Sequence, residues 1–146
     1  MNVHLRDYES RDLDFARSLY FETMRPAIES IFGWDEARQI ASFNGWFKPE
    51  EVSVITVDGL DAGWIQQRLD HDAVFLGSIY IAPRMQRRGV GSHVIRQLLD
   101  HAKAQSRAAT LAVMKNNPAI ALYKRLGFRI THEDEYKFYM RAEVAT

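Results

Sequence analysis

The sequence predicts an α/β fold, or one of the related α+β kind, in which a mixed β-sheet is flanked by helices. The first observation is the order of the expected elements, β, α, α, β, β, β, α, β, α, β, β, taken from apolar periodicity. The second is the length, because 146 residues suit a single domain with its own core, residues 1–146. The third is the lack of internal repeats and linker-like stretches.

The first third of the chain is expected to form a strand followed by helices. Residues 2–8 alternate apolar and polar side chains, which is typical of a strand. Ser10 is a candidate cap for a first helix. Pro26 is typical of the first turn of a second helix, which Gly33 breaks, and residues 34–47 continue as helix with Asp35 as a candidate cap.

Two hairpins and a buried strand are expected in the middle of the chain. Residues 51–70 contain two β-rich runs around Asp58-Gly59, a pair that favours a tight hairpin turn. Residues 70–72 turn the chain again, and residues 73–83 form an apolar strand that ends at Pro83. Gly77, in the middle of that strand, suggests a bulge or a close backbone approach.

The last third alternates helices and strands. A helix with apolar residues at helical spacing is expected after Gly91 and ends near Ser106. Asn117 and Pro118 predict the start of another helix, and Gly127 predicts its end. The expected strands of this region cover residues 108–114, 128–134 and 136–144.

Composition excludes several classes of function. Lys plus Arg and Asp plus Glu each number 19, so the net charge is zero and we expect neither a nucleic-acid nor a membrane partner. The chain has no cysteine and no HxxxH or HExxH pair, so no metal site is expected. The start, MNVHLRDYES, lacks the apolar core of a signal peptide, and the run AVFLGSIYIA is too short to span a bilayer as a helix. These features predict a cytoplasmic protein.

The stretch QRRGVGSH, residues 86–93, predicts a phosphate-binding loop. Glycines before a helix let backbone N–H groups approach an anion closely. A P-loop is excluded because no Lys-Ser or Lys-Thr follows the glycines, and a dinucleotide fingerprint is weak because Val94 occupies the third glycine position. The pattern Q/R-x-x-G-x-G/A fits at every fixed position. A tight strand-to-helix turn with solvated arginines is the alternative.

A second motif, VMKNNPAIALYKRLGF at residues 113–128, follows at a distance of one helix and one strand. Together the two motifs resemble the GNAT superfamily of acetyl-CoA-dependent N-acetyltransferases. The resemblance implies a GNAT-like acyl-CoA N-acyltransferase fold in which the fourth and fifth strands splay apart, with acetyl-CoA bound in the gap. The cofactor-binding residues that it implies are Ile79, Tyr80, Ile81, Gln86, Arg87, Arg88, Gly89, Val90, Gly91, Ser92, Asn116 and Tyr123.

Tyr123 occupies the position of the general acid in this family, so the resemblance implies that it protonates the leaving thiolate. Spacing alone favours a tyrosine in a helical core stripe, and the surrounding motif favours catalysis. The general base is open, because Phe75 stands near the position where many members carry a glutamate. The alternatives are a water relayed through Ser78, Tyr80 or a backbone carbonyl, a carboxylate among Glu133, Asp134 and Glu135, or an acceptor that arrives neutral.

The resemblance implies direct transfer of an acetyl group to a primary amine of a small molecule or peptide within a ternary complex, and it allows a homodimer. The alternative is a catalytically silent CoA-binding sensor of the same fold. Segments that build the acceptor site in the family combine aromatic rings with carboxylates here, a mixture that suits an ammonium group. The acceptor-site residues expected on this basis are Glu29, Trp34, Asp35 and Tyr136.

Overall fold

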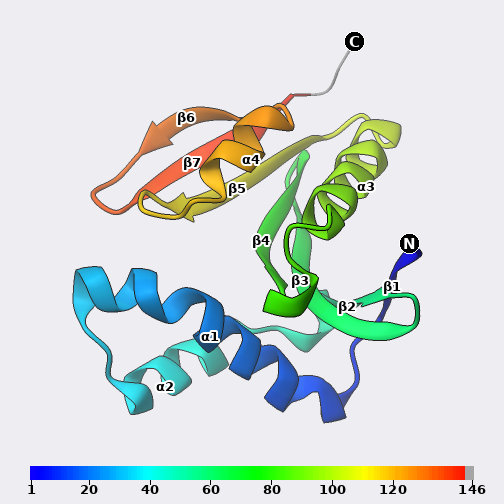
Figure 1. Cartoon of the computed structure of the whole chain (residues 1–146). Coiled ribbons are helices and arrows are strands. Elements are labelled where there is room, and N and C mark those ends of the chain that lie inside the picture. Colours follow the sequence, from blue (N-terminus) through cyan, green and yellow to red (C-terminus); the bar gives the residue numbers. More distant parts are fainter. Residues whose placement is uncertain (144–146) are drawn as a thin grey trace.

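A computed structural model describes residues 1–143 and contains one seven-stranded sheet in the order β1-β2-β3-β4-β5-β7-β6 (Figure 1). Val144, the last residue of the expected final strand, and the end of the expected domain lie outside the described residues. The strands are β1 (Val3–Asp7), β2 (Val52–Val57), β3 (Leu60–Asp70), β4 (Ala73–Ile81), β5 (Ala108–Met114), β6 (Arg129–Glu133) and β7 (Lys137–Ala142). The helices are α1 (Leu13–Phe32), α2 (Glu36–Trp46), α3 (Val90–Ala104) and α4 (Ile120–Arg125). The predicted mixed sheet flanked by helices is confirmed.

Both faces of the sheet are covered, because side chains on a strand alternate between its two faces. Trp64 packs with residues of α1 and α2, whereas the next residue, Ile65, packs in the core that α3 and α4 cover. The second core is rich in aromatic rings: Trp64 is fully buried and stacks on Trp46 with ring centroids 6.2 Å apart. Helices α1 and α2 therefore cover one face of the sheet, and α3 and α4 cover the other (Figure 1).

Helix α1 corrects the prediction of a new helix at Pro26, because one continuous helix runs from Leu13 to Phe32 with Pro26 inside it. Proline removes the hydrogen bond to the carbonyl four residues earlier, here that of Glu22. Both residues are exposed, so solvent can bind this carbonyl and the helix continues. The cap predicted for α2 is confirmed, since the Asp35 carboxylate accepts a hydrogen bond from Arg38 N at 3.2 Å.

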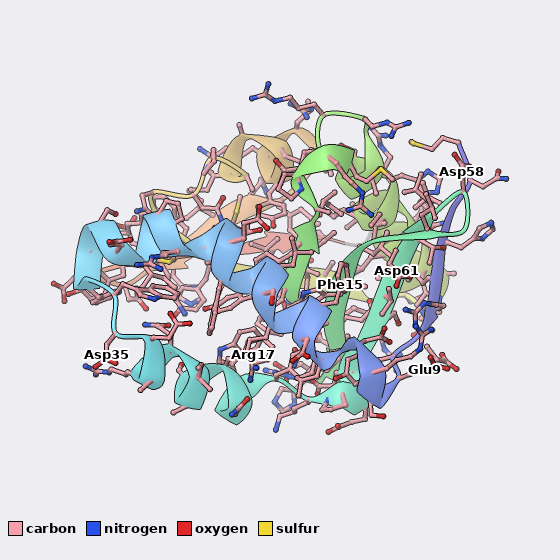
Figure 2. The ribbon with its side chains drawn as sticks, turned by 60° about the horizontal axis from the view of Figure 1, so that its bottom comes forward. Glu9, Phe15, Arg17, Asp35, Asp58 and Asp61 are labelled. Atoms are coloured by element: carbon pink, nitrogen blue, oxygen red, sulfur yellow. The ribbon has the colours of Figure 1, made fainter. Side chains whose placement is uncertain are left out.

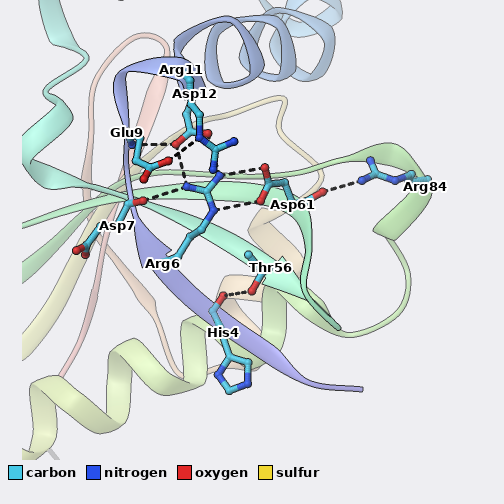
Figure 3. Close-up of polar contacts among 9 residues, drawn as sticks. All are labelled: His4, Arg6, Asp7, Glu9, Arg11, Asp12, Thr56, Asp61 and Arg84. Carbon is cyan, nitrogen blue, oxygen red and sulfur yellow. Dashed lines mark hydrogen bonds and ion pairs between the residues drawn. The ribbon is translucent and has the colours of Figure 1, made fainter.

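Ser10 does not cap the first helix, which corrects a second prediction. A 3-10 turn precedes α1, and the Asp12 carboxylate at its end accepts a hydrogen bond from Glu9 N at 2.9 Å. The Arg6 guanidinium holds this carboxylate in place at 2.8 and 2.9 Å and also binds Asp61 on β3 at 3.0 and 3.2 Å (Figure 3). Hydrogen bonding to Arg6 lowers the pKa of Asp12. One arginine therefore fixes β1, the start of α1 and β3 relative to one another.

Strands β3 and β4 approach so closely at Gly63 that a side chain has no room. A Cβ atom at this position would lie 2.1 Å from the carbonyl oxygen of Tyr80. Gly63→Ala should therefore lower the free energy of unfolding by roughly 1–3 kcal/mol, the usual cost of overpacking, measured by urea denaturation.

Gly45→Ala in α2 is the matched control, because a Cβ there would meet no atom within 4 Å. Alanine is the better helix former, so this variant should gain up to about 1 kcal/mol. Equal unfolding midpoints for the two variants would contradict the close approach at Gly63.

Candidate functional site

The site begins where β4 and β5 separate. They pair in parallel only from Ala73–Leu76 to Ala108–Leu111; beyond these residues β4 keeps its partner β3, and β5 keeps its partner β7. The predicted splay of the fourth and fifth strands is confirmed. Backbone groups of residues 79–81 that face β5 consequently have no strand to pair with.

A bulge at Gly77 accompanies the splay. Gln66 on β3 pairs with Ser78 and Gln67 pairs with Leu76, so Gly77 is the extra residue of β4. A Cβ atom at Gly77 would lie 3.4 Å from the carbonyl oxygen of Gln66, so the position is tight for any side chain. The bulge expected from the sequence at this glycine is therefore present, and it turns the edge of β4 away from β5.

Two hollows, of about 370 and 250 Å³, follow this split. The larger extends toward α2 and β3, and the smaller extends toward the glycine loop, α3 and α4. Residues that line both, and so mark their junction, are Met24, Ile79, Tyr80, Asn117 and Tyr123. We call the two hollows together the cleft.

The glycine loop closes one end of the cleft. The φ angle is 63° at Arg87 and 80° at Gly89, and the first bond of helix α3 runs from His93 N to Gly89 O at 3.0 Å. The N–H groups of Val90, Gly91 and Ser92 therefore have no partner inside the helix. No acidic side chain lies in the first turn. This end of the cleft has the arrangement that binds phosphate groups.

The polar side chains of the loop are exposed, and three of them also make hydrogen bonds within the protein, among them Arg88, which donates to Met85 Sδ at 3.3 Å. Gln86 Nε2 donates to the carbonyl oxygen of Ile81 at 2.9 Å, which ties the loop to the end of β4. Arg84 donates to the carbonyl oxygen of Asp61 at 2.6 Å. Arg87 and Arg88 are exposed beside the helix start, where their charge can reach an anion.

Tyr123 lies at the junction of the two hollows, on α4. It is 8% exposed, and burial raises the pKa of its hydroxyl to about 12. The hydroxyl therefore keeps its proton at neutral pH, as a proton donor must. Burial also raises the pKa of the neighbouring Tyr80 well above its usual range.

Asn116 and Asn117 have different surroundings from those the motif suggests. Asn116 Nδ2 donates to Ala27 O at 3.3 Å and to Ser30 Oγ at 3.1 Å, so this side chain joins the end of β5 to α1. Asn117, which lines both hollows, also accepts a hydrogen bond from Ala119 N at 2.9 Å. The cofactor role of Asn116 remains a prediction.

The four residues expected at the acceptor site lie outside the cleft. Glu29 and Trp34 line a separate hollow beside the connection between α1 and α2, where Figure 2 shows Asp35. Tyr136 packs on Phe32 with ring centroids 4.8 Å apart. Their role in acceptor binding also remains a prediction, and an acceptor would have to reach beyond the cleft to meet them.

Several residues of the cleft carried no sequence motif. Gln66 and Arg68 lie on the face of β3 that also carries Trp64, and Lys137 begins β7. The alternation of side chains along a strand predicts that Gln66 and Arg68 lie on the same face of β3. Their position beside the gap between β4 and β5 depends on strand register, which the sequence does not show. Three cleft-lining side chains lie in the segments expected to build the acceptor site, namely Tyr20, Met24 and Lys137, and those outside both these segments and the motifs include Trp46, Gln66 and Arg68.

The candidate bases of the last hairpin do not line the cleft. Glu133 pairs with Lys115 at 2.7 Å, and the Asp134 carboxylate accepts from the backbone N–H groups of Tyr136 and Lys137. Within residues 1–143 no group of three or more His, Asp or Glu side chains could hold a metal ion. No helix in the same part of the chain is long and apolar enough to cross a membrane.

Comparisons with known proteins agree with this geometry. The family model described as "Acetyltransferase (GNAT) family" matches residues 7–128. No curated protein sequence matches the chain.

Solved structures are similar over almost the whole chain. PaiA N-acetyltransferase from Thermoplasma acidophilum, in complex with coenzyme A, superposes with a TM-score of 0.79 at 16% identity, covering 98% of this chain and 99% of that chain. The ribosomal-protein-S18-alanine N-acetyltransferase from Escherichia coli gives a TM-score of 0.71 at 23% identity, covering 99% and 96%. Ard1 from Thermoplasma volcanium gives 0.70 at 22% identity, covering both chains completely. At these identities the likeness shows the fold.

Proposed function

The chain belongs to the acetyltransferase (GNAT) family, and from this membership we propose that it transfers the acetyl group of acetyl-CoA to a primary amine of a small molecule or peptide. The observation that supports the proposal is the cleft itself. The cleft is lined by the glycine loop, by the part of β4 that does not pair with β5, and by the protonated Tyr123.

The residues along the cleft fit acetyl-CoA. The N-terminus of α3 and the charges of Arg87 and Arg88 would hold the pyrophosphate. The free edge of residues 79–81 would pair with the amides of the pantetheine arm as an added strand pairs with a sheet. The thioester would then lie near the bulge at Gly77, where a backbone N–H group can bind its carbonyl oxygen.

Direct attack is the proposed chemistry. The neutral amine nitrogen attacks the thioester carbon, a C–N bond forms, and the C–S bond breaks. The hydroxyl of Tyr123 donates its proton to the departing sulfur, and the amine releases a proton to solvent. The chain has no cysteine, so no cysteinyl intermediate is available.

The proposal is tested by incubating the protein with acetyl-CoA and a panel of primary amines and measuring release of the free thiol. Thiol release that depends on an amine, with the acetylated amine identified by mass spectrometry, supports it. Tight CoA binding without thiol release for any amine would instead support the silent sensor.

Tyr123→Phe keeps the ring and removes only the hydroxyl. We expect kcat to fall by about tenfold or more, within the range for loss of a general acid, with an unchanged KM for acetyl-CoA. A general acid works while it is protonated, so a pKa of about 12 predicts no loss of wild-type kcat through this group below about pH 11.

Tyr8→Phe is the control, because Tyr8 packs against Phe47, away from the cleft. Its kcat should equal that of the wild type. Equal kcat values for both variants, with chemistry limiting the rate, would assign Tyr123 to packing alone.

Gly91→Ala tests the phosphate loop. A Cβ atom at Gly91 would meet only the Ile81 side chain, at 3.8 Å, so the folded protein has room for it. A pyrophosphate held against the same backbone would not, and we expect the Kd for CoA to rise about tenfold, the equivalent of about 1.4 kcal/mol.

Calorimetry measures the CoA affinity, and urea denaturation should give an unfolding midpoint no lower than that of the wild type, because alanine is the better helix former. Gly45→Ala, an exposed position on α2 away from the phosphate loop, should leave CoA affinity unchanged. An unaltered Kd in Gly91→Ala would exclude close contact of this glycine with the ligand.

A further inference from the structure

The charges around the larger hollow are of one sign. Among the described residues that line it, the only charged side chains are Arg68 and Lys137, and none is a carboxylate. A simple ammonium ion would therefore meet positive charge and no counter-ion there. This contrasts with the carboxylate-rich acceptor site that the sequence suggested.

The two cations come from opposite sides of the split. Arg68 is on β3, next to β4, and pairs across the ladder with Phe75. Lys137 is on β7, next to β5, and pairs with Met114. Arg68 is level with the segment in which β4 and β5 still pair, and Lys137 is level with the end of β5 that lies beyond this pairing, so the two cations line the hollow at different points along the split.

Among the described residues, neither cation has a side-chain hydrogen bond to a carboxylate, although Asp70 lies near Arg68, and hydrogen bonds together with the charge of Lys137 lower the pKa of Asp134. The Arg68 guanidinium lies over the Phe75 ring, 4.5 Å from its centroid, and its nearest carboxylate oxygen, on Asp70, is 3.9 Å away. The side chain remains 45% exposed, so its N–H donors are available to a ligand. Lys137 has no carboxylate within 4 Å in the part of the chain that the structure describes.

Nearby carboxylates already have donors. Asp134 accepts from Tyr136 N, Lys137 N and the Tyr139 hydroxyl at 2.7–2.9 Å. Glu51 accepts from Gln66 Nε2 at 3.0 Å. Their oxygens stabilise the surrounding backbone and side chains and do not line the hollow.

Gln66 adds a neutral acceptor beside the cations. Its Nε2 donates to Trp46 O and to Glu51 Oε1, which fixes the orientation of the amide because both partners only accept. Its Oε1 is the only buried side-chain oxygen or nitrogen within residues 1–143 that lacks a partner. The oxygen is itself buried, so an amine N–H reaches it only when neighbouring side chains move, and an amide binds an amine without removing its proton.

We propose that the acceptor is a small amine that also carries a carboxylate, such as a free amino acid. Its carboxylate lies between Arg68 and Lys137, and its amine lies toward Gln66 and the bulge at Gly77. Arginine and lysine supply the charge-assisted donors that a carboxylate requires, and the substrate's own anion compensates the two cations. This inference rests on the proposed acetyl transfer and narrows its acceptor.

The test compares amino acids with matched amines in acetyl transfer to measure kcat/KM. Alanine is paired with ethylamine, and phenylalanine is paired with phenethylamine. Phenylalanine amide has nearly the shape of phenylalanine but no carboxylate charge, so it tests the charge alone. We expect the carboxylated member of the preferred pair to react about tenfold faster or more, the usual worth of a charge-assisted hydrogen bond.

Arg68→Gln and Lys137→Gln should each raise the KM for the amino acid about tenfold and reduce its preference over the matched amine. The KM for acetyl-CoA should not change. Arg129→Gln, which removes an exposed charge from edge strand β6, is the control for net charge and should behave as the wild type.

The possible failures are distinguishable. If amines without a carboxylate react as well as the amino acids, or if both cation variants keep wild-type KM values, this inference fails while acetyl transfer stands. If no amine of either kind reacts although acetyl-CoA binds, the proposed function fails and this inference fails with it.

Discussion

The cleft and the residues around it depend on the short parallel pairing between β4 and β5, which covers only four residues of each strand. Beyond Leu76 and Leu111 the two strands diverge, and each keeps a paired strand only on its outer side. Backbone polar groups away from water require partners, so an open edge in the middle of a sheet is stable only where solvent or a ligand can reach it. The cleft is the direct consequence, and the bulge at Gly77 places the change of direction at its centre.

The two arms on either side of the split are held by different means. Arg6 fastens β1 and β3 on one arm through Asp12 and Asp61. On the other arm β7 pairs along the whole of β5 beyond its first residue. Helix α1 spans both arms, since Tyr20 packs on Tyr80 of β4 and the carbonyl of Ala27 binds Asn116 after β5. The width of the cleft therefore depends on α1 as well as on the sheet.

Local signals in the sequence predicted those features that local chemistry decides. The turn at Asp58-Gly59, the cap at Asp35 and the bulge at Gly77 each depend on one or two residues and their immediate neighbours. Pro26 was misinterpreted because solvent exposure allows a proline inside a helix, and exposure is a property of the whole fold.

Cleft side chains from distant strands could not be predicted. Arg68 and Lys137 are 69 residues apart in the sequence. They line the same hollow only because the sheet has the strand order β3-β4-β5-β7. The motifs indicated the cofactor side because that side consists of one continuous loop and helix. The opposite side is assembled from β3, β7, α1 and α2, and the sequence alone contains no information on their register.

The stacked pair of indole rings gives the molecule a built-in optical signal. Trp46 lines the cleft and stacks on the buried Trp64, whereas Trp34 lies apart, beneath the guanidinium of Arg25. Two of the three fluorophores therefore share one environment at the acceptor half of the cleft. Intrinsic emission of the unlabelled protein should respond to a molecule that displaces water from Trp46, and Trp34, which lines a separate hollow, adds emission from outside the cleft.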